Sequence, residues 1–156
     1  MTTRESVESA ATDDSAKRTS AVQVAVRVRP LSAGESAQGS EPCVSVVGAR
    51  TVLLGGVDGK QYEVDAALAP STPQEVVYST LVTPLIDRFF DGYNATVLAY
   101  GQTGSGKTFT MGNEFNLSSP TCERGIIPRT MSEIFKRITT STASSDARRF
   151  VLKISF

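Results

Sequence analysis

The sequence lacks several residues on which whole classes of protein depend. It contains no His and no Trp, and its two cysteines are Cys43 and Cys122. Without His, the chain has neither a His-based catalytic triad nor a His-containing zinc site. Two cysteines are too few for a disulfide scaffold or a Cys-only metal site, so we expect a reduced, intracellular protein.

Net charge and long apolar runs are also missing. Sixteen Lys and Arg balance sixteen Asp and Glu, so the formal net charge is zero. This balance argues against general nucleic-acid binding, which requires an excess of basic charge. No stretch approaches the roughly 18 consecutive apolar residues of a membrane-spanning helix, so no membrane partner is expected. What is present is a 40% hydrophobic composition in 156 residues, which suits one domain with a real core.

The first twenty residues differ in composition from the rest. Residues 1–20 are rich in Ser, Thr, Ala and charge, and they lack the apolar segment of a signal peptide. Such a segment buries too little surface to offset the entropy of ordering, so we predict a disordered N-terminal tail over residues 1–20. The remaining residues, 21–156, are assigned to one domain.

Period-two patterns predict strands at the start of this domain. Val occupies every second position from 22 to 28, and Pro30 ends the pattern because proline cannot donate to a sheet. Three short strand candidates follow, punctuated by Gly-Gly and Asp-Gly pairs, at 43–47, 51–54 and 61–64. Their close spacing predicts a small antiparallel β lobe over residues 43–64.

Apolar residues at helical spacing predict two helices. The first opens at Thr72-Pro73-Gln74-Glu75, with Thr72 as the cap and Glu75 completing a capping box. Pro84 is expected to kink this helix or to divide it in two. The second begins at Pro128 and is followed by a polar linker over 139–145. The apolar stripe of the first helix, expected in the core, comprises Val77, Leu81, Leu85 and Phe89.

Two more segments have the pattern of strands. Residues 96–100 form an apolar run typical of a fully buried strand. In residues 150–156, large apolar side chains at every second position alternate with Val151, Lys153 and Ser155, which is also typical of a strand. The polar residues 113–124 predict an exposed loop. Strands that alternate with helices predict an α/β fold, with a predominantly parallel or mixed central sheet and flanking helices.

The strongest chemical signal is the pattern G-x-x-x-x-G-K-[ST] at residues 101–108. Its glycines permit positive φ and leave the backbone N–H groups free to surround a phosphate. Lys107 would reach the β- and γ-phosphates, and Thr108 would hold Mg²⁺. The alternative is a flexible Gly-Ser loop that matches the motif by chance. The predicted phosphate-binding residues are Gly101, Gln102, Thr103, Gly104, Ser105, Gly106, Lys107 and Thr108.

Residues that would carry out hydrolysis are not evident. A P-loop enzyme also holds its Mg²⁺ through an acidic residue at the end of an apolar strand. The carboxylates after Thr108 lie in polar segments or within a helical pattern; they are Glu114, Glu123, Glu133 and Asp146. We therefore predict binding of a nucleotide and assign no catalytic residue.

Three blocks of the sequence resemble the kinesin motor domain. They are VAVRVRP at 24–30, a long block at 92–112 that contains YGQTGSGKT, and GIIPR at 125–129. They occur in kinesin order with kinesin-like gaps, and the resemblance covers about residues 21–156. The run GYNAT at 92–96 is similar to that of chromokinesins.

The resemblance implies a P-loop NTPase of kinesin type that binds ATP and Mg²⁺, has microtubules as its partner and lies on the cytoskeleton in the cytoplasm. In kinesins the Arg-x-Arg-Pro segment flanks the adenine. By position, Arg27 and Pro30 would line the adenine pocket, and Phe109 would offer it an aromatic face. Without the resemblance, Arg27 and Arg29 are more typical of solvated charges on a strand than of ligand contacts. Phe109 is as typical of a core residue as of a residue that stacks on a base.

The sequence departs from the family in its length. The two switch blocks of kinesins, N-x-x-S-S-R-S-H and D-L-A-G-S-E, do not occur in these residues. The resemblance therefore implies a truncated fold, the N-terminal part of a motor whose ATP-driven movement belongs to the complete protein. Whether this chain alone is an enzyme stays open. The alternatives are a non-catalytic nucleotide-binding module, another P-loop enzyme such as a nucleotide kinase, and a partial product without motor activity.

Overall fold

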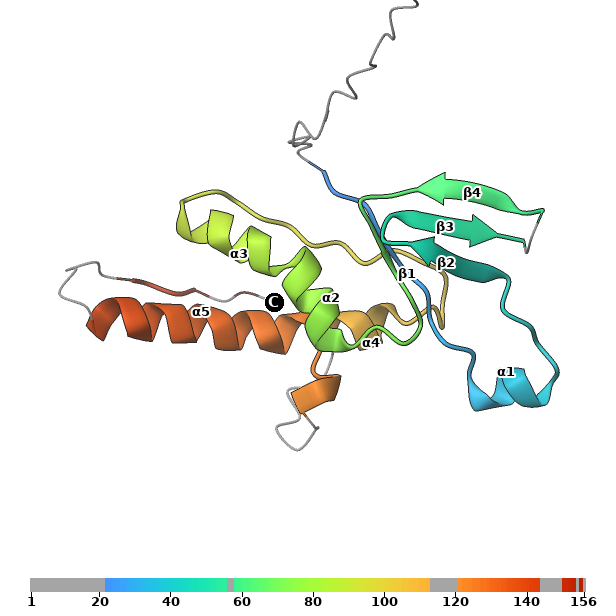
Figure 1. Ribbon diagram of the computed structural model, residues 1–156. Helices are drawn as coiled ribbons and strands as arrows, with labels where there is room; N and C mark the ends of the chain where they lie inside the picture. The colour runs from blue at the N-terminus through green and yellow to red at the C-terminus, as the bar shows by residue number, and fades with distance from the viewer. Residues whose placement is uncertain (1–21, 56–57, 113–120, 144–149, 154, 156) are drawn as a thin grey trace, which may run out of the picture.

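The computed structural model describes residues 22–55, 58–112, 121–143, 150–153 and 155 (Figure 1). The strands gather on one side of the molecule, and three helices gather on the other. These helices are α2 (Gln74–Leu81), α3 (Thr83–Phe90) and α5 (Ile126–Ala143). The predicted tail at 1–20 and most of the predicted loop at 113–124 lie outside the described residues.

A parallel pair of short strands crosses the middle of the molecule (Figure 1). β1 (Ala25–Arg27) pairs with β5 (Ala66–Leu68), and the N–H of Val28 extends the pair by donating to the carbonyl oxygen of Leu68 at 2.9 Å. All three residues of β5 are buried, as expected for a parallel strand. The strand predicted over 22–28 is confirmed over a shorter span, because β5 offers it only three paired residues.

The antiparallel lobe forms where the sequence predicts it. β2 (Val44–Gly48), β3 (Thr51–Leu54) and β4 (Lys60–Glu63) make a three-stranded sheet with β3 in the centre. Val52 in β3 is only 5% exposed. The N–H of Ala67 donates to the carbonyl oxygen of Ala49 at 2.8 Å and joins the lobe to β5. The α/β fold with parallel and antiparallel pairing and a small antiparallel lobe is thus confirmed.

A short helix, α1 (Ala33–Ala37), occupies a segment for which the sequence analysis predicts only a loop. It begins with a capping box. The backbone N–H of Glu35 donates to Ser32 Oγ at 3.2 Å, and the backbone N–H of Ser32 donates to the Glu35 carboxylate at 2.7 Å. Each interaction satisfies a backbone donor that the first turn of a helix leaves unpaired.

The continuous pattern after residue 73 forms two helices, α2 (Gln74–Leu81) and α3 (Thr83–Phe90). Pro84 lies in the first turn of α3, so the predicted division at this proline is confirmed. The predicted capping box at the start of α2 is wrong. Pro73, with an extended ψ of 154°, takes the N-cap position and leaves Thr72 outside the helix.

The core lies between the α2–α3 pair and α5 (Ile126–Ala143). Because the division at Pro84 interrupts the helical repeat, α3 buries Ile86, whereas Phe89 from the predicted stripe is 44% exposed. The predicted linker is wrong over residues 139–143, which continue α5. The hydroxyl groups of Thr139 and Thr140 are paired inside that helix, with carbonyl oxygens one turn earlier. The buried cluster comprises Tyr78, Val82, Ile86, Ile126 and Ile134.

The predicted strand at 96–100 does not form, and the one predicted at 150–156 is absent from the part of that segment that the structure describes. In residues 96–100, Leu98 is 85% and Tyr100 is 96% exposed, so the predicted buried strand is wrong. A strand requires hydrogen bonds from a neighbouring strand, and none lies beside these residues in the part of the chain that the structure describes. Residues 150–153 are also outside any sheet.

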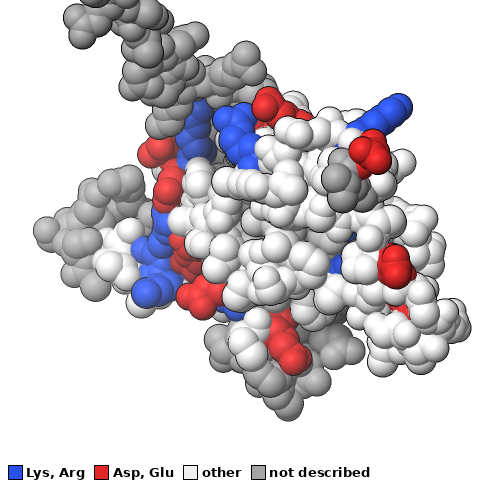
Figure 2. Space-filling view, turned by 45° about the vertical axis from the view of Figure 1, so that its right-hand side comes forward, with Lys and Arg blue, Asp and Glu red and all other residues white. Residues whose placement is uncertain are grey.

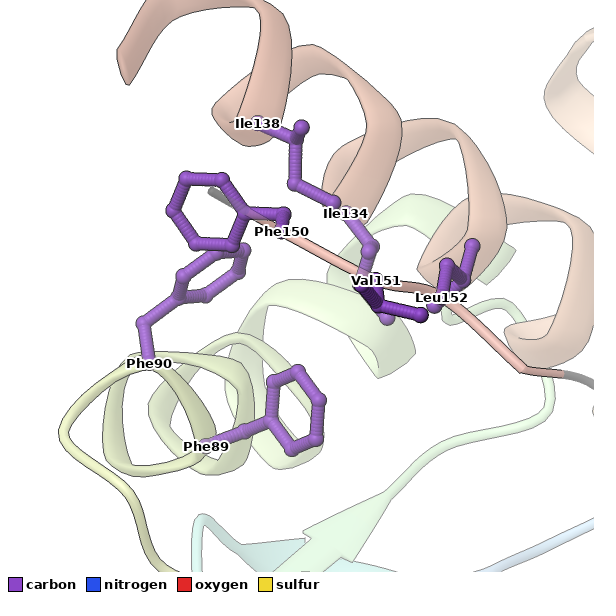
Figure 3. Close-up of a pocket in the computed structure, with 7 residues that line it drawn as sticks. All are labelled: Phe89, Phe90, Ile134, Ile138, Phe150, Val151 and Leu152. Atoms are coloured by element: carbon purple, nitrogen blue, oxygen red, sulfur yellow. The ribbon is translucent and has the colours of Figure 1, made fainter. Parts of the chain in front are cut away.

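The segment at 150–152 instead packs across an apolar hollow between α3 and α5 (Figure 3). The ring of Phe150 meets that of Phe90 edge to face, with 6.3 Å between the ring centroids. The hollow encloses about 210 Å³ and is lined by Phe89, Phe90, Ile134, Ile138, Phe150, Val151 and Leu152. Phe150 therefore packs against a helix rather than within a sheet, and Val151 and Leu152, which also line the hollow, are 73% and 38% exposed.

Candidate functional site

Glycines shape the loop at residues 101–108, which leads into α4 (Lys107–Met111). Gly104 (φ 79°) and Gly106 (φ 94°) have left-handed backbone conformations, and Gly106 is the N-cap of α4. Residues with a Cβ rarely adopt these angles. An added Cβ at Gly104 would meet no atom within 4 Å, so conformation rather than lack of space selects glycine there.

Lys107 reaches back across the loop to its first residues. Its Nζ donates to the carbonyl oxygens of Gly101 and Gln102, each at 2.8 Å. The backbone N–H of Ser105 also donates to the carbonyl oxygen of Gln102, at 3.2 Å. An ammonium group has three donors, so these two bonds leave one N–H for an anion. The structure thus brings the predicted phosphate-binding residues together in one closed turn.

Thr108 follows in the first turn of α4 and is exposed, as are Gln102, Thr103 and Gly104 at the tip of the loop. Its hydroxyl oxygen is a hard ligand of the kind that Mg²⁺ prefers. Within the described residues, no group of three or more Cys, Asp or Glu side chains is placed to hold a metal ion.

Arg27 and Phe109, both predicted for an adenine pocket, are in contact. The Arg27 guanidinium lies over the Phe109 ring, with 5.3 Å from its carbon to the ring centroid. Its Nη1 donates to Gln74 Oε1 at 2.8 Å and to Thr110 Oγ1 at 2.9 Å. Burial lowers the pKa of Arg27, but a guanidinium stays charged in proteins. Pro30 is exposed, three residues further along the chain.

Arg29, whose role the sequence leaves open, lies beside the phosphate-binding loop. A Cβ added to Gly106 would be 3.8 Å from the Cδ atom of Arg29. The guanidinium forms a 2.6 Å ion pair with Glu35 and donates to the carbonyl oxygen of Pro30 at 2.9 Å. Hydrogen bonds from Arg29 and from Ser32 lower the pKa of Glu35 to about 2. The start of α1 thereby holds the Arg29 stem against the loop.

Gln74 is a functional candidate that the sequence analysis missed. It is the first residue of α2 and is only 4% exposed. Its side chain bonds to Arg27 and to the carbonyl oxygens of Phe109 and of Glu123, the last residue of η1 (Thr121–Glu123). No pattern in the sequence distinguishes it from an exposed glutamine at the start of a helix.

Glu133, one of the carboxylates that follow the loop in sequence, lies in α5 where this helix packs against α2 and α3. It accepts hydrogen bonds from Tyr78 Oη, at 2.5 Å, and from Arg137. Arg137 also forms a 2.7 Å ion pair with Asp87. Burial and the neighbouring Glu133 raise the pKa of Tyr78. These groups link the helices and lie apart from the residues that form the loop site.

The surface charge agrees with the balanced composition. On the face shown in Figure 2, basic and acidic side chains of the described residues adjoin at the left and at the top, and uncharged surface covers most of the described remainder. No broad region of one sign covers the described part of this face. Among the described residues, none of the helices combines the length and the apolar character needed to cross a bilayer.

Comparison with known proteins identifies the family. The family model named Kinesin motor domain matches residues 27–156, which include the Arg-x-Arg-Pro segment and the whole loop at 101–108. The chain belongs to the kinesin motor-domain family. The predicted family and the predicted kinesin-type P-loop fold are confirmed.

Curated relatives and solved structures agree with this assignment. Kinesin-like protein klp-19 of Caenorhabditis elegans is 44% identical over 123 residues, which are 78% of this chain. Chromosome-associated kinesin KIF4A of Homo sapiens is 45% identical over 138 residues, which are 86% of this chain. The Drosophila kinesin Kin10/NOD, in complex with divalent manganese and ADP, matches 81% of this chain with a TM-score of 0.68 and 30% identity.

The kinesin chain described here is much shorter than these relatives. It spans 11% of klp-19, 11% of KIF4A and 41% of the matched NOD chain. A second NOD structure, docked with bovine tubulin into a map of nucleotide-free NOD on the microtubule, matches at a TM-score of 0.68 and 28% identity. Relatives of similar identity include chromosome-associated and other kinesins, so the GYNAT run does not assign a subfamily.

Proposed function

We propose that this chain is the ATP-binding part of a kinesin-like microtubule motor, in which ATP drives movement along microtubules in the complete protein. One observation carries the proposal. The loop at 101–108 is closed by Lys107 and turned by two left-handed glycines, and an exposed Thr108 follows it directly. Membership of the kinesin family supports this choice over a flexible Gly-Ser loop or a nucleotide kinase.

In this proposal, the backbone N–H groups of residues 104–108 bind the phosphate oxygens of ATP. Lys107 neutralises charge on the β- and γ-phosphates, and Thr108 Oγ1 holds Mg²⁺. A Mg²⁺ ion held there by Thr108 would supply positive charge that offsets the charge of the phosphates. The complex of NOD with ADP and divalent manganese supports a nucleotide with a divalent metal.

The base side of the proposed site involves Arg27, Pro30 and Phe109. Phe109 is 55% exposed, so part of its ring is free to stack on an adenine. Arg27 bonds to protein groups and contacts the ring. We therefore assign stacking to Phe109 and the support of its ring to Arg27, and we include Pro30 in the base side on the resemblance to kinesins alone.

Microtubules are the proposed partner of the complete protein, and the microtubule cytoskeleton of the cytoplasm is its proposed location. The family assignment supports both, as does the matched structure of NOD docked with tubulin. We assign no residue of this chain to the microtubule contact. Residues 21–156 are proposed to form an N-terminal portion of the motor domain, and a disordered tail at 1–20 stays a prediction.

A second candidate function is nucleotide binding without hydrolysis by this chain alone. The observation that favours it is the position of Glu133, which bonds to Tyr78 and Arg137 instead of facing the loop. The sequence also contains neither switch block. Phosphate release from ATP by the purified chain, accelerated by microtubules, would exclude this second candidate.

Calorimetric titration with Mg-ATP tests the proposed site. We expect the chain to bind Mg-ATP and expect Lys107→Ala to weaken binding at least about 100-fold, because a charge-assisted contact to phosphate is lost. Lys136→Ala is the matched control, since Lys136 is exposed on α5. Equal affinities of the wild-type chain and Lys107→Ala would refute the assignment of the loop.

A further inference from the structure

The buried side chain of Gln74 joins three segments that meet beside the proposed site. Its Oε1 accepts from Arg27 Nη1 at 2.8 Å, which ties α2 to the end of β1. Its Nε2 donates to the carbonyl oxygen of Phe109 at 2.6 Å, in α4, and to that of Glu123 at 3.4 Å, in η1. One amide group thus connects β1, α4 and η1.

The chemistry of these partners determines how the amide of Gln74 is oriented. A guanidinium can only donate, so Arg27 requires the amide oxygen on its side. A backbone carbonyl can only accept, so Phe109 and Glu123 require the NH₂ group on theirs. The one acceptor group and both N–H donors of the amide are used. A flipped amide would lose all of these bonds at a site that is 4% exposed.

Phe109 is held by this arrangement at two points. Gln74 bonds directly to its backbone carbonyl. Its ring lies under Arg27, which Gln74 and Thr110 keep in place through hydrogen bonds of 2.8 and 2.9 Å. Gln74 has no hydrogen bond to residues 101–108. Its direct hydrogen bonds at the site are therefore to Phe109 and to Arg27, on the aromatic side.

We propose that Gln74 is the positioning residue for the base-recognition side of the site, and that it orients the Phe109 ring toward the aromatic base of a nucleotide. This inference rests on the proposed nucleotide function and assigns recognition of the base and binding of the phosphates to different residues. Ligands with a base depend on Gln74, whereas ligands that consist of phosphate alone depend on the loop at 101–108.

The test compares two ligands on the full chain, Mg-ADP and Mg-pyrophosphate. Gln74→Met removes all three bonds at similar length, and Gln74→Glu keeps an acceptor for Arg27 but sets a carboxylate oxygen against two carbonyls. We expect both variants to bind Mg-ADP about tenfold more weakly, because a buried hydrogen-bond network is broken. Mg-pyrophosphate affinity should change less than about threefold. Gln61→Glu, at an exposed position of β4, is the matched control.

The outcomes separate this inference from the proposed function. Unchanged Mg-ADP affinity in both variants overturns the inference, and so do equal losses for the two ligands, which a merely structural role predicts. A wild-type chain that binds neither ligand overturns the proposed function and the inference with it. If circular dichroism shows that the Gln74 variants are unfolded, Phe109→Leu replaces them. Phe109→Leu should weaken the binding of Mg-ADP but not that of Mg-pyrophosphate. An equal effect on both ligands, or none on either, would contradict the inference.

Discussion

Two regions of this kinesin chain both have strand patterns but have different structures. The lobe from β2 to β4 forms the predicted sheet, and its central Val52 is 5% exposed. Residues 96–100 are more continuously apolar, but they pair with no strand among the described residues, and Leu98 is 85% exposed. The difference between them lies in where the neighbouring strands come from.

In the lobe, each pair is formed by strands that are neighbours in sequence, so the local sequence contains both partners. A parallel strand needs partners from distant parts of the chain. Its apolar residues indicate only that other elements must cover its faces. An apolar run therefore identifies a surface to be buried without identifying what buries it.

The largest expected effect comes from a charge placed in the lobe. Val52→Asp buries an unpaired carboxylate, and we expect it to lower the free energy of unfolding by at least about 3 kcal/mol. Urea unfolding followed by circular dichroism measures this change. A loss below about 1 kcal/mol would contradict the burial of β3.

A smaller effect tests whether local contacts also stabilise α1. In the folded chain the pKa of Glu35 is lowered from 4.5 to about 2. Its contribution to stability is therefore fully present above 4.5 and is lost as the pH falls through about 2. Carbon NMR of the Glu35 carboxyl group should give a titration midpoint near 2. A midpoint near 4.5 would mean that the contacts with Arg29 and Ser32 do not persist in solution.

The smallest expected effect completes the comparison. Leu98→Asp introduces the same charge into the other strand pattern, where the side chain is 85% exposed. We expect the free energy of unfolding to change by less than about 0.5 kcal/mol, measured in the same urea series as Val52→Asp. An equal loss of unfolding free energy in Val52→Asp and Leu98→Asp would contradict the contrast between the two regions, because it would show that residues 96–100 are buried in solution.

The same distinction explains what the sequence could predict of the site. The closed turn at 101–108 could be predicted because the residues that form it, its glycines and Lys107, are neighbours in sequence. Gln74 was not, because its partners Arg27 and Phe109 lie 47 and 35 residues away. Only the folded chain brings these three together.

Other differences between prediction and structure were local and could have been found. Ser32 and Glu35 match the capping-box pattern that starts α1, but the box was assigned to Thr72 and Glu75. The break at Pro84 was expected, whereas its effect on which face of α3 is buried was not. A pattern counted across a proline does not keep its helical phase.

The most direct test of the central claim is the response of individual backbone amides to a nucleotide. The account predicts that, in ¹H–¹⁵N spectra of the chain, Mg-ADP shifts the N–H signals of residues 104–108 more than any others. Those signals should stay in place when Mg²⁺ is added alone. Saturating Mg-ADP that leaves them unmoved, or that moves chiefly the amides of α5, would contradict the claim that this turn holds the phosphates.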